Sequence, residues 1–326
     1  MGEKDLDAAP FGLVGRTLGH SWSRQIHERL GSAPYALHEL EPDEVAPFVR
    51  GGAWRGLNVT IPYKRRAAEL ADERSPRVER LGAANTLVRR EDGSILAENT
   101  DVLGFFWMLA RFCRRELGSS VNEALGSRKA LVLGSGGASQ AVRLALEEYA
   151  GMDVVTVSRS GTETYEGLAR RHADAALVVN TTPVGMFPNC PASPLDEETL
   201  SALTGLVAVL DVVYNPRRTG LLLSAAERRG LPAESGLAML VAQALYASEL
   251  FQGRDLDDSL VAEVEGQIRA QTENVVLIGM PGAGKSSCGR ALARLLGRPF
   301  VDVDEAIALE CGRTAAQIIR EDGEEA

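Results

Sequence analysis

The stretch Ala130-Leu-Val-Leu-Gly-Ser-Gly-Gly-Ala-Ser139 decides the fold of the middle of this 326-residue chain. Four apolar residues run directly into a glycine-rich turn, and a helical pattern follows over 139–149. In such a turn the first glycine permits a tight bend, and the second lets backbone N–H groups approach a pyrophosphate at the positive end of the helix. The strand–turn–helix context favours a dinucleotide site over an ordinary loop, although Ser139 replaces the third glycine of the usual pattern.

The next expected strand, 154–157, ends in Ser158-Arg159-Ser160. An acidic residue near this position would bind the ribose 2′-hydroxyl of NAD, whereas an arginine with two hydroxyls suits the 2′-phosphate of NADP. The alternative is that Arg159 is only a solvated residue at a strand end. Glu163, four residues further on, counts against a phosphate at this place.

Outward from this unit, short apolar runs alternate with helical stretches, which predicts an α/β protein with parallel sheets. The expected strands are 11–15, 35–40, 57–61, 86–89, 130–133, 154–157, 176–179, 208–213 and 275–278. The expected helices are 23–30, 103–117, 139–149, 220–229, 238–250 and 257–271.

Changes in composition predict the domain boundaries. A polar stretch follows the helix at 103–117, and a new strand begins at Asn274 after the polar helix at 257–271. We therefore expect three parts. They are an α/β substrate-binding domain over 1–104, onto which the helices in 238–271 pack back, a Rossmann domain over 105–237, and a third segment over 273–326.

The composition limits the class of protein. The chain is 45% hydrophobic and 25% charged, which excludes a disordered chain or a disulfide scaffold. Its net charge of −10 disfavours nucleic acid as a partner. Because the sequence has no membrane-length apolar run, no signal-peptide pattern and no closely spaced cysteines, we expect a cytoplasmic protein with free thiols and no membrane contact.

Lysine is rare in this chain, since arginine supplies almost all of the positive charge. A retained lysine is then more often needed for a property that arginine lacks, such as giving up a proton. Lys64 ends the segment Leu57-Asn-Val-Thr-Ile-Pro-Tyr-Lys64, whose alternation predicts that Leu57, Val59 and Ile61 face a core. Asn58 and Thr60 then face the other way. Because Pro62 ends the strand, Lys64 is expected at a strand-to-helix junction, where its ammonium can overhang a cleft.

Two further segments have both a structural and a functional interpretation. Asp101 precedes the helix at 103–117, where it is either a helix N-cap or a functional carboxylate. Spacing alone favours the N-cap for Asp101 and a surface position for Lys64. Gly19-His-Ser-Trp-Ser23 places two hydroxyls just before a helix, either to cap it at Ser23 or to donate to a carboxylate.

Eight segments, in the same order along residues 11–265, resemble the motifs of shikimate dehydrogenases. They are Gly19–Ser23, Asn58–Lys64, Gly82–Thr86, Asn99–Asp101, Gly134–Ala138, Asn180–Met186, Asp211–Pro216 and Gly236–Gln243. The resemblance implies NADPH-dependent reduction of 3-dehydroshikimate to shikimate, a step of aromatic amino acid and chorismate biosynthesis. It leaves open whether the chain forms a homodimer.

The resemblance also implies the site residues. Lys64 and Asp101 would be the catalytic pair, with Lys64 passing a proton to or from the oxygen on the carbon that receives hydride. The substrate would meet Ser21, Ser23, Asn58, Thr60, Asn85, Asp101, Tyr214 and Gln243. NADP(H) would meet Gly134, Ser135, Gly136, Gly137, Ala138, Ser158, Arg159, Ser160, Val212, Gly236 and Met239.

The C-terminal segment contains a second nucleotide motif. Gly279-Met-Pro-Gly-Ala-Gly-Lys-Ser286 follows an expected strand over 274–278 and precedes a helical pattern, which fits a P-loop. In a P-loop the backbone around Gly279, Gly282 and Gly284 cradles the phosphates of ATP, Lys285 reaches them and Ser286 holds Mg²⁺.

Residues 300–304 resemble shikimate kinase, which implies that Asp302 supports the magnesium ion and that Asp304 meets a substrate hydroxyl. Because the sequence stops at Ala326, before the later strands and lid of that family, we expect an incomplete and inactive kinase-like α/β segment.

Three rival functions remain at this point. The first is an NAD-linked quinate/shikimate dehydrogenase, against which Arg159 counts. The second is a non-catalytic sensor of shikimate-type ligands, which would not need both Lys64 and Asp101. The third makes the P-loop the functional centre of the chain.

Overall fold

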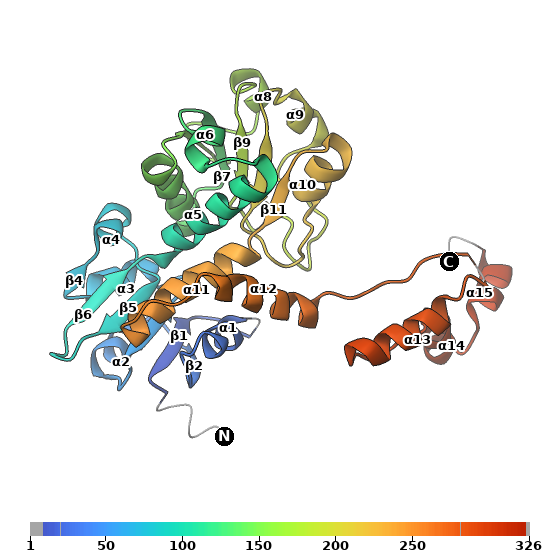
Figure 1. Ribbon diagram of the computed structural model, residues 1–326, viewed down its shortest axis with the longest axis horizontal. Helices are drawn as coiled ribbons and strands as arrows, with labels where there is room; N and C mark the ends of the chain where they lie inside the picture. Colours follow the sequence, from blue (N-terminus) through green and yellow to red (C-terminus); the bar gives the residue numbers. More distant parts are fainter. Residues whose placement is uncertain (1–8, 20, 281, 324–326) are drawn as a thin grey trace. The chain divides into compact units, whose positions relative to one another are not determined.

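The computed structural model describes residues 9–19, 21–280 and 282–323, so that His20 and Pro281 of the quoted motifs lie outside the described residues. The chain divides into two compact units, Met1–Arg269 and Ala270–Ala326. Figure 1 shows both units, and each is described here by itself.

The first sheet of the larger unit has the strand order β2-β1-β3-β5-β6-β4. Strands β1 to β3 are parallel, but β5 is antiparallel to both β3 and β6, so the expectation of a purely parallel sheet is wrong here. The β5–β6 pair is antiparallel because a tight turn at Gly93 joins the two strands directly. The elements are β1 (Phe11–Gly15), α1 (Ser23–Arg29), β2 (Tyr35–Glu39), α2 (Val45–Gly51), β3 (Gly56–Val59), α3 (Lys64–Leu70), β4 (Glu73–Arg74), α4 (Pro76–Leu81), β5 (Thr86–Arg89) and β6 (Ile95–Glu98).

The second sheet is parallel throughout, in the order β11-β10-β9-β7-β8. Its buried strands are nearly continuous runs of Val, Leu and Ala, as expected for a sheet with helices on both faces. The elements are α6 (Val121–Leu125), β7 (Lys129–Leu133), α7 (Gly137–Leu144), β8 (Asp153–Val157), α8 (Leu168–Arg171), β9 (Leu177–Asn180), α9 (Glu197–Ala202), β10 (Ala208–Asp211), α10 (Gly220–Leu223) and β11 (Ala233–Ser235).

Two long helices connect the sheets. Helix α5 (Thr100–Phe112) leads from the first sheet to the second, and α11 (Leu237–Gln252) returns beside it (Figure 1). They approach most closely at Gly104, where an added Cβ would lie 2.7 Å from the Gln243 backbone nitrogen and 2.8 Å from the Met239 carbonyl oxygen. Helix α12 (Ser259–Thr272) shares an apolar cluster with α1 and α11.

One strand ends earlier than its sequence predicts. Strand β3 stops at Val59, and Ile61 is 76% exposed rather than buried with Leu57 and Val59. The chain leaves the sheet here because Pro62 cannot donate to a ladder hydrogen bond. Lys64 consequently begins α3 directly after this turn.

The smaller unit contains α13 (Lys285–Leu296), α14 (Val303–Cys311) and α15 (Ala315–Asp322). The expected strand over 274–278 is wrong, since no strand occurs among the residues of this unit that the structure describes. A strand needs a hydrogen-bonded neighbour, and residues 274–278 have none among the described residues of this unit. Val276 and Ile278 are accordingly 75% and 89% exposed. Within the described ranges of the whole chain, no helix has both the length and the apolar character of a membrane span.

The crossing of α5 and α11 gives a test with a matched control. Gly104→Ala should lower the free energy of unfolding by about 1–3 kcal/mol, because the new Cβ overpacks against the backbone of α11. Gly266→Ala, in the exposed part of α12 where a Cβ would meet nothing, should instead raise it by about 0.5–1 kcal/mol. Urea denaturation measures both, and a neutral Gly104→Ala would show that the crossing is not tight.

Candidate active site

A lysine and an aspartate form a charged hydrogen bond between the start of α3 and the start of α5. Lys64, the first residue of α3, donates from Nζ to Oδ2 of Asp101, the second residue of α5, over 2.6 Å. Their side chains are only 22% and 14% exposed. Asn99, rather than Asp101, occupies the N-cap position of α5, and Lys64 is not a solvated surface lysine.

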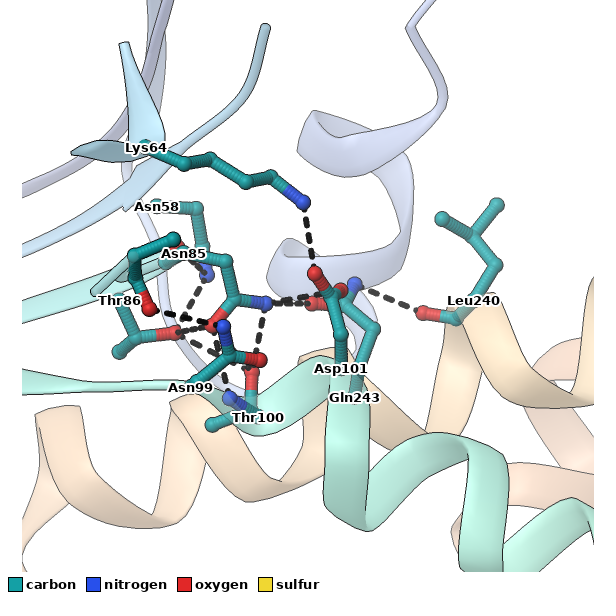
Figure 2. A network of polar contacts seen from close by, with 10 residues as sticks. Asn58, Lys64, Asn85, Thr86, Asn99, Thr100, Asp101, Leu240 and Gln243 are labelled. Carbon is teal, nitrogen blue, oxygen red and sulfur yellow. Dashed lines mark hydrogen bonds and ion pairs between the residues drawn. The ribbon is translucent and has the colours of Figure 1, made fainter. Parts of the chain in front are cut away.

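A hub of amide hydrogen bonds fixes this aspartate (Figure 2). The side-chain amide of Asn85 donates to Asp101 Oδ1 over 2.9 Å and to Gln243 Oε1 over 3.3 Å. Its oxygen accepts from the Thr100 backbone N–H over 2.7 Å. Because Asn85 precedes β5 and Gln243 lies on α11, three elements converge on one polar cluster.

Asn58 extends the cluster towards β3. Its side-chain nitrogen donates to Thr86 Oγ1 over 3.3 Å, and its oxygen accepts from the buried Tyr35 hydroxyl over 2.8 Å. The amide orientation is therefore set from both sides. Thr60 directly follows β3 and is half-buried. Its backbone N–H donates to the Val14 carbonyl over 2.9 Å, which places Thr60 at the same end of the sheet as Asn58.

The two serines of the first motif lie together before α1. Ser21 Oγ donates to Ser23 Oγ over 3.1 Å and accepts from the Ser23 backbone N–H over 3.2 Å. Ser23 begins the helix, and Trp22, rather than Ser23, is at the N-cap position. Both hydroxyls are half-buried.

The glycine-rich turn between β7 and α7 has the geometry that a dinucleotide requires. Gly134 has a φ of +113°, and a Cβ there would lie 2.8 Å from Thr181 Oγ1, so only glycine fits. Gly136 and Gly137 face open space at the N-terminus of α7, where backbone N–H groups can approach phosphates. Ser139 packs closely and donates to the Gly134 carbonyl over 2.7 Å. Ser135 and Ala138 complete the turn and are exposed and half-buried respectively.

The turn after β8 presents Arg159 and Ser160 to solvent, with Ser158 buried behind them. The negative charge of Glu163 is paired. Its carboxylate accepts a hydrogen bond from Arg171 over 2.9 Å and contacts His172 at 3.3 Å. The hydrogen bond from Arg171 lowers the pKa of Glu163. The Glu163 carbonyl also accepts from the Ser158 backbone N–H, which holds the turn in shape.

A buried carboxylate organises the loops after β9 and β10. Asp211 accepts from Asn180 over 3.0 Å, from Thr219 over 2.7 Å and from the Val213 backbone N–H over 2.9 Å. Burial raises the pKa of Asp211 to about 6.

The loop that this carboxylate holds carries Val212, which approaches Gly236 so closely that a Cβ on the glycine would lie 2.1 Å from the Val212 oxygen. Met239 is 8% exposed and packs in the core between α5 and α11.

The P-loop of the smaller unit is formed locally. Gly282 and Gly284 have left-handed backbones, with φ of +78° and +80°. Lys285 Nζ donates to the carbonyls of Gly279 and Met280 over 2.8 and 3.0 Å.

Ser286 Oγ donates to Asp302 Oδ2 over 2.8 Å. A hydroxyl beside a carboxylate at a P-loop fits magnesium, which takes oxygen ligands. Asp304 directs its backbone N–H to Asp302. Among the described residues, no group of three or more His, Cys, Asp or Glu side chains could hold a metal ion.

Sequence reasoning gave no role to several residues that build the site. Thr86, Thr100 and Tyr35 anchor the amides of Asn85 and Asn58. Thr86 and Thr100 lie next to the candidate site residues Asn85 and Asp101 in the quoted motifs. Their position at a strand start and a helix start was the available sign that they belong to the site. Tyr35 begins β2, in a segment that the sequence marked only as a strand, and carried no such signal.

The shikimate dehydrogenase substrate binding domain matches residues 13–87, and shikimate kinase matches residues 281–326. The shikimate dehydrogenase (NADP(+)) of Oleidesulfovibrio alaskensis is 38% identical over 76% of this chain and 90% of its own length.

Two solved structures are similar across nearly their whole length. Shikimate 5-dehydrogenase from Thermus thermophilus, in complex with NADP(H) and shikimate, has a TM-score of 0.65 at 32% identity and covers 79% of this chain and 98% of its own. Quinate dehydrogenase from Corynebacterium glutamicum, in complex with NAD, has a TM-score of 0.66 at 27% identity, with the same coverage.

The mixed sheet, the two connecting helices and the parallel sheet with its glycine-rich turn are the architecture of a two-domain α/β protein that binds a dinucleotide. The curated relatives show that its class is an oxidoreductase. Sequence identity above 30% to curated shikimate dehydrogenases, over about three quarters of this chain, narrows the class to one family. The chain belongs to the shikimate dehydrogenase family, and it carries a shikimate kinase match at its C-terminal side.

Proposed function

We propose that this chain catalyses the reversible, NADP-dependent reduction of 3-dehydroshikimate to shikimate. The single observation that carries the proposal is the 2.6 Å hydrogen bond between Lys64 and Asp101. Reduction of a ketone leaves an alkoxide that needs one proton, and a lysine ammonium held beside a carboxylate is suited to provide it. The family membership supplies the substrate class.

In this mechanism the protein residues orient the substrate and move one proton. Bound at the second sheet, NADPH supplies the hydride. Lys64 Nζ gives a proton to the substrate oxygen, and in the reverse direction takes it back. Asp101 accepts hydrogen bonds from Lys64 and from a substrate hydroxyl, while Asn85 keeps its carboxylate in place.

The remaining polar residues bind the two ligands. Ser21, Ser23, Thr60 and Tyr214 hold the substrate carboxylate, and ring hydroxyls meet Asn58, Asn85, Asp101 and Gln243. Gly134, Ser135, Gly136, Gly137 and Ala138 would hold the dinucleotide pyrophosphate, and Ser158, Arg159 and Ser160 would hold the 2′-phosphate. Val212, Gly236 and Met239 would contact the nicotinamide. Arg159 favours NADP over the NAD that a quinate-type enzyme would use, since a guanidinium pairs with phosphate.

Each part of the chain has its own role in this proposal. Residues 1–104 with the helices of 238–271 form the substrate domain, residues 105–237 bind NADP, and residues 273–326 are a kinase-like segment. In that segment the P-loop would hold ATP, with Ser286 and Asp302 towards Mg²⁺. The segment is catalytically inactive, because its P-loop has no sheet behind it in the described ranges. Three exposed free cysteines support a reducing, cytoplasmic location. The net charge of −10 disfavours a nucleic acid partner.

The role of Lys64 predicts a specific pattern of variants. Lys64→Ala and Lys64→Arg should both lower kcat by about 10²–10⁴-fold, because neither side chain transfers a proton readily. Shikimate binding should stay within a few-fold of wild type. NADPH absorbance measures the rate, and calorimetry the binding. Lys129→Arg is the control and should keep full activity, since Lys129 begins β7 and pairs with the exposed Asp174 rather than with a site residue; a Lys64→Arg enzyme as fast as that control would refute proton transfer.

The cofactor assignment predicts a selective loss. Arg159→Asp should lower kcat/KM for NADP by about 10²-fold or more, since a charge-assisted contact is replaced by repulsion. With NAD the change should be smaller. Arg254→Asp, beyond the far end of α11, makes the same charge change and should affect neither cofactor. Equal losses with both cofactors in Arg159→Asp would show that Arg159 does not contact the 2′-phosphate.

The kinase-like segment predicts an absence of activity. Incubation of the full chain with ATP, Mg²⁺ and shikimate should yield no shikimate 3-phosphate, because an isolated phosphate cradle does not position the second substrate. Removal of residues 273–326 should leave the dehydrogenase rate unchanged. Steady phosphate transfer that Lys285→Ala abolishes would contradict the proposal.

A further inference from the structure

An aromatic pair connects the loops of the two sheets. Trp22 stands between Ser21 and Ser23 immediately before α1, on the side of the first sheet. Tyr214 lies in the loop after β10, in the second sheet. Their ring centroids are 5.0 Å apart with the planes inclined by 53°. Both rings pack against the cluster formed by α1, α11 and α12.

The polar end of Tyr214 is available to a ligand. Its ring is half-buried, and burial raises the pKa of its hydroxyl, so that the group remains a protonated donor at neutral pH. Within the described part of the chain, this hydroxyl makes no hydrogen bond. The hydroxyls of Ser21 and Ser23 flank the residue whose ring contacts Tyr214, and Ser23 Oγ still has its hydrogen to donate.

The Tyr214 loop is also tied to the cofactor side. The Val213 backbone N–H donates to the buried Asp211, and its carbonyl accepts from Gly236 over 3.1 Å. Val212, the residue between, donates its N–H to the carbonyl of Asn180, the last residue of β9. A displacement of Tyr214 therefore changes the loop that lies at the nicotinamide end of the dinucleotide site.

We propose that Trp22 is a positioning residue that couples binding of the substrate carboxylate to binding of the dinucleotide. The inference rests on the proposed function and extends it. A carboxylate held by Ser21, Ser23 and Tyr214 fixes the position of Trp22, which lies between the serines. The Trp22 ring packs on the Tyr214 ring and thereby holds the Tyr214 loop in the conformation that binds the nicotinamide. Because coupling of this kind is reciprocal, each ligand raises the affinity of the other by the same factor.

The test measures two affinities, each with and without the other ligand. Shikimate and NADPH are used together because both are reduced and cannot react. In the wild type, each ligand should tighten the other by about 5-fold to 100-fold. Trp22→Ala should reduce this factor to about 2 or less, while the affinity for NADPH alone changes little. Trp22→Phe keeps an aromatic ring and should retain most of the coupling.

Trp107→Ala is the matched control, since Trp107 is a half-buried tryptophan that packs in the same cluster. It should preserve the coupling factor even if it lowers stability. An equal loss of coupling in Trp107→Ala, or wild-type coupling in Trp22→Ala, overturns the inference. An active wild type without coupling overturns the inference alone, whereas a wild type that neither binds shikimate nor oxidises NADPH with 3-dehydroshikimate overturns the proposed function.

Tryptophan fluorescence gives an independent readout, because the chain has only three tryptophans. Shikimate binding should change the emission of the wild type and of Trp54→Phe, whose ring is buried under Arg89. The change should disappear in Trp22→Phe, which still binds the ligand. A change that persists in Trp22→Phe would show that Trp22 does not sense the carboxylate site, and would contradict the coupling role.

Discussion

The charged hydrogen bond between Lys64 and Asp101 is the interaction on which the arrangement of the site depends. It joins the start of α3 to the start of α5, and α5 continues into the second sheet. A lysine and a carboxylate withdrawn from water are stable only when their remaining hydrogen-bonding capacity is satisfied. Asn85 does this for Asp101, and the close crossing of α5 and α11 at Gly104 brings Gln243 to the same amide. The contacts that hold α3, α5 and α11 together are therefore the same contacts that position the candidate catalytic side chains.

Much of this arrangement could be predicted from the sequence. The glycine-rich turn at 134–138 identified a parallel, nucleotide-binding sheet, because its strand, turn and helix are adjacent in the chain. The pairing of Lys64 with Asp101 followed only from family resemblance, since spacing alone favoured a surface lysine and an N-cap. The anchoring by Tyr35 could not be predicted, because a buried hydroxyl in an apolar strand is recognisable only once its partner, Asn58, is placed beside it.

Two errors have the same physical origin. Ile61 and the segment at 274–278 both continue an apolar pattern, yet neither is buried. An apolar pattern shows which side chains a strand would bury if a neighbouring strand were present. At Ile61 the hydrogen bonds of β3 have already ended, because Pro62 cannot donate one. Residues 274–278 have no neighbouring strand among the described residues. Glu163 is the opposite case, since its charge counted against a phosphate but is neutralised by Arg171. In each case the outcome depends on hydrogen-bonding partners, which a hydrophobic or charge pattern does not report.

The most direct test of the account is the crystal structure of the full chain with shikimate and NADP⁺ bound, using Lys64→Met if turnover prevents capture of the native complex. The account predicts that the Asp101 carboxylate, and in the native complex Lys64 Nζ, lie within about 2.6–3.2 Å of the substrate hydroxyl that faces the nicotinamide. It would be contradicted by a structure in which that hydroxyl is bound by other groups, with both residues beyond hydrogen-bond distance.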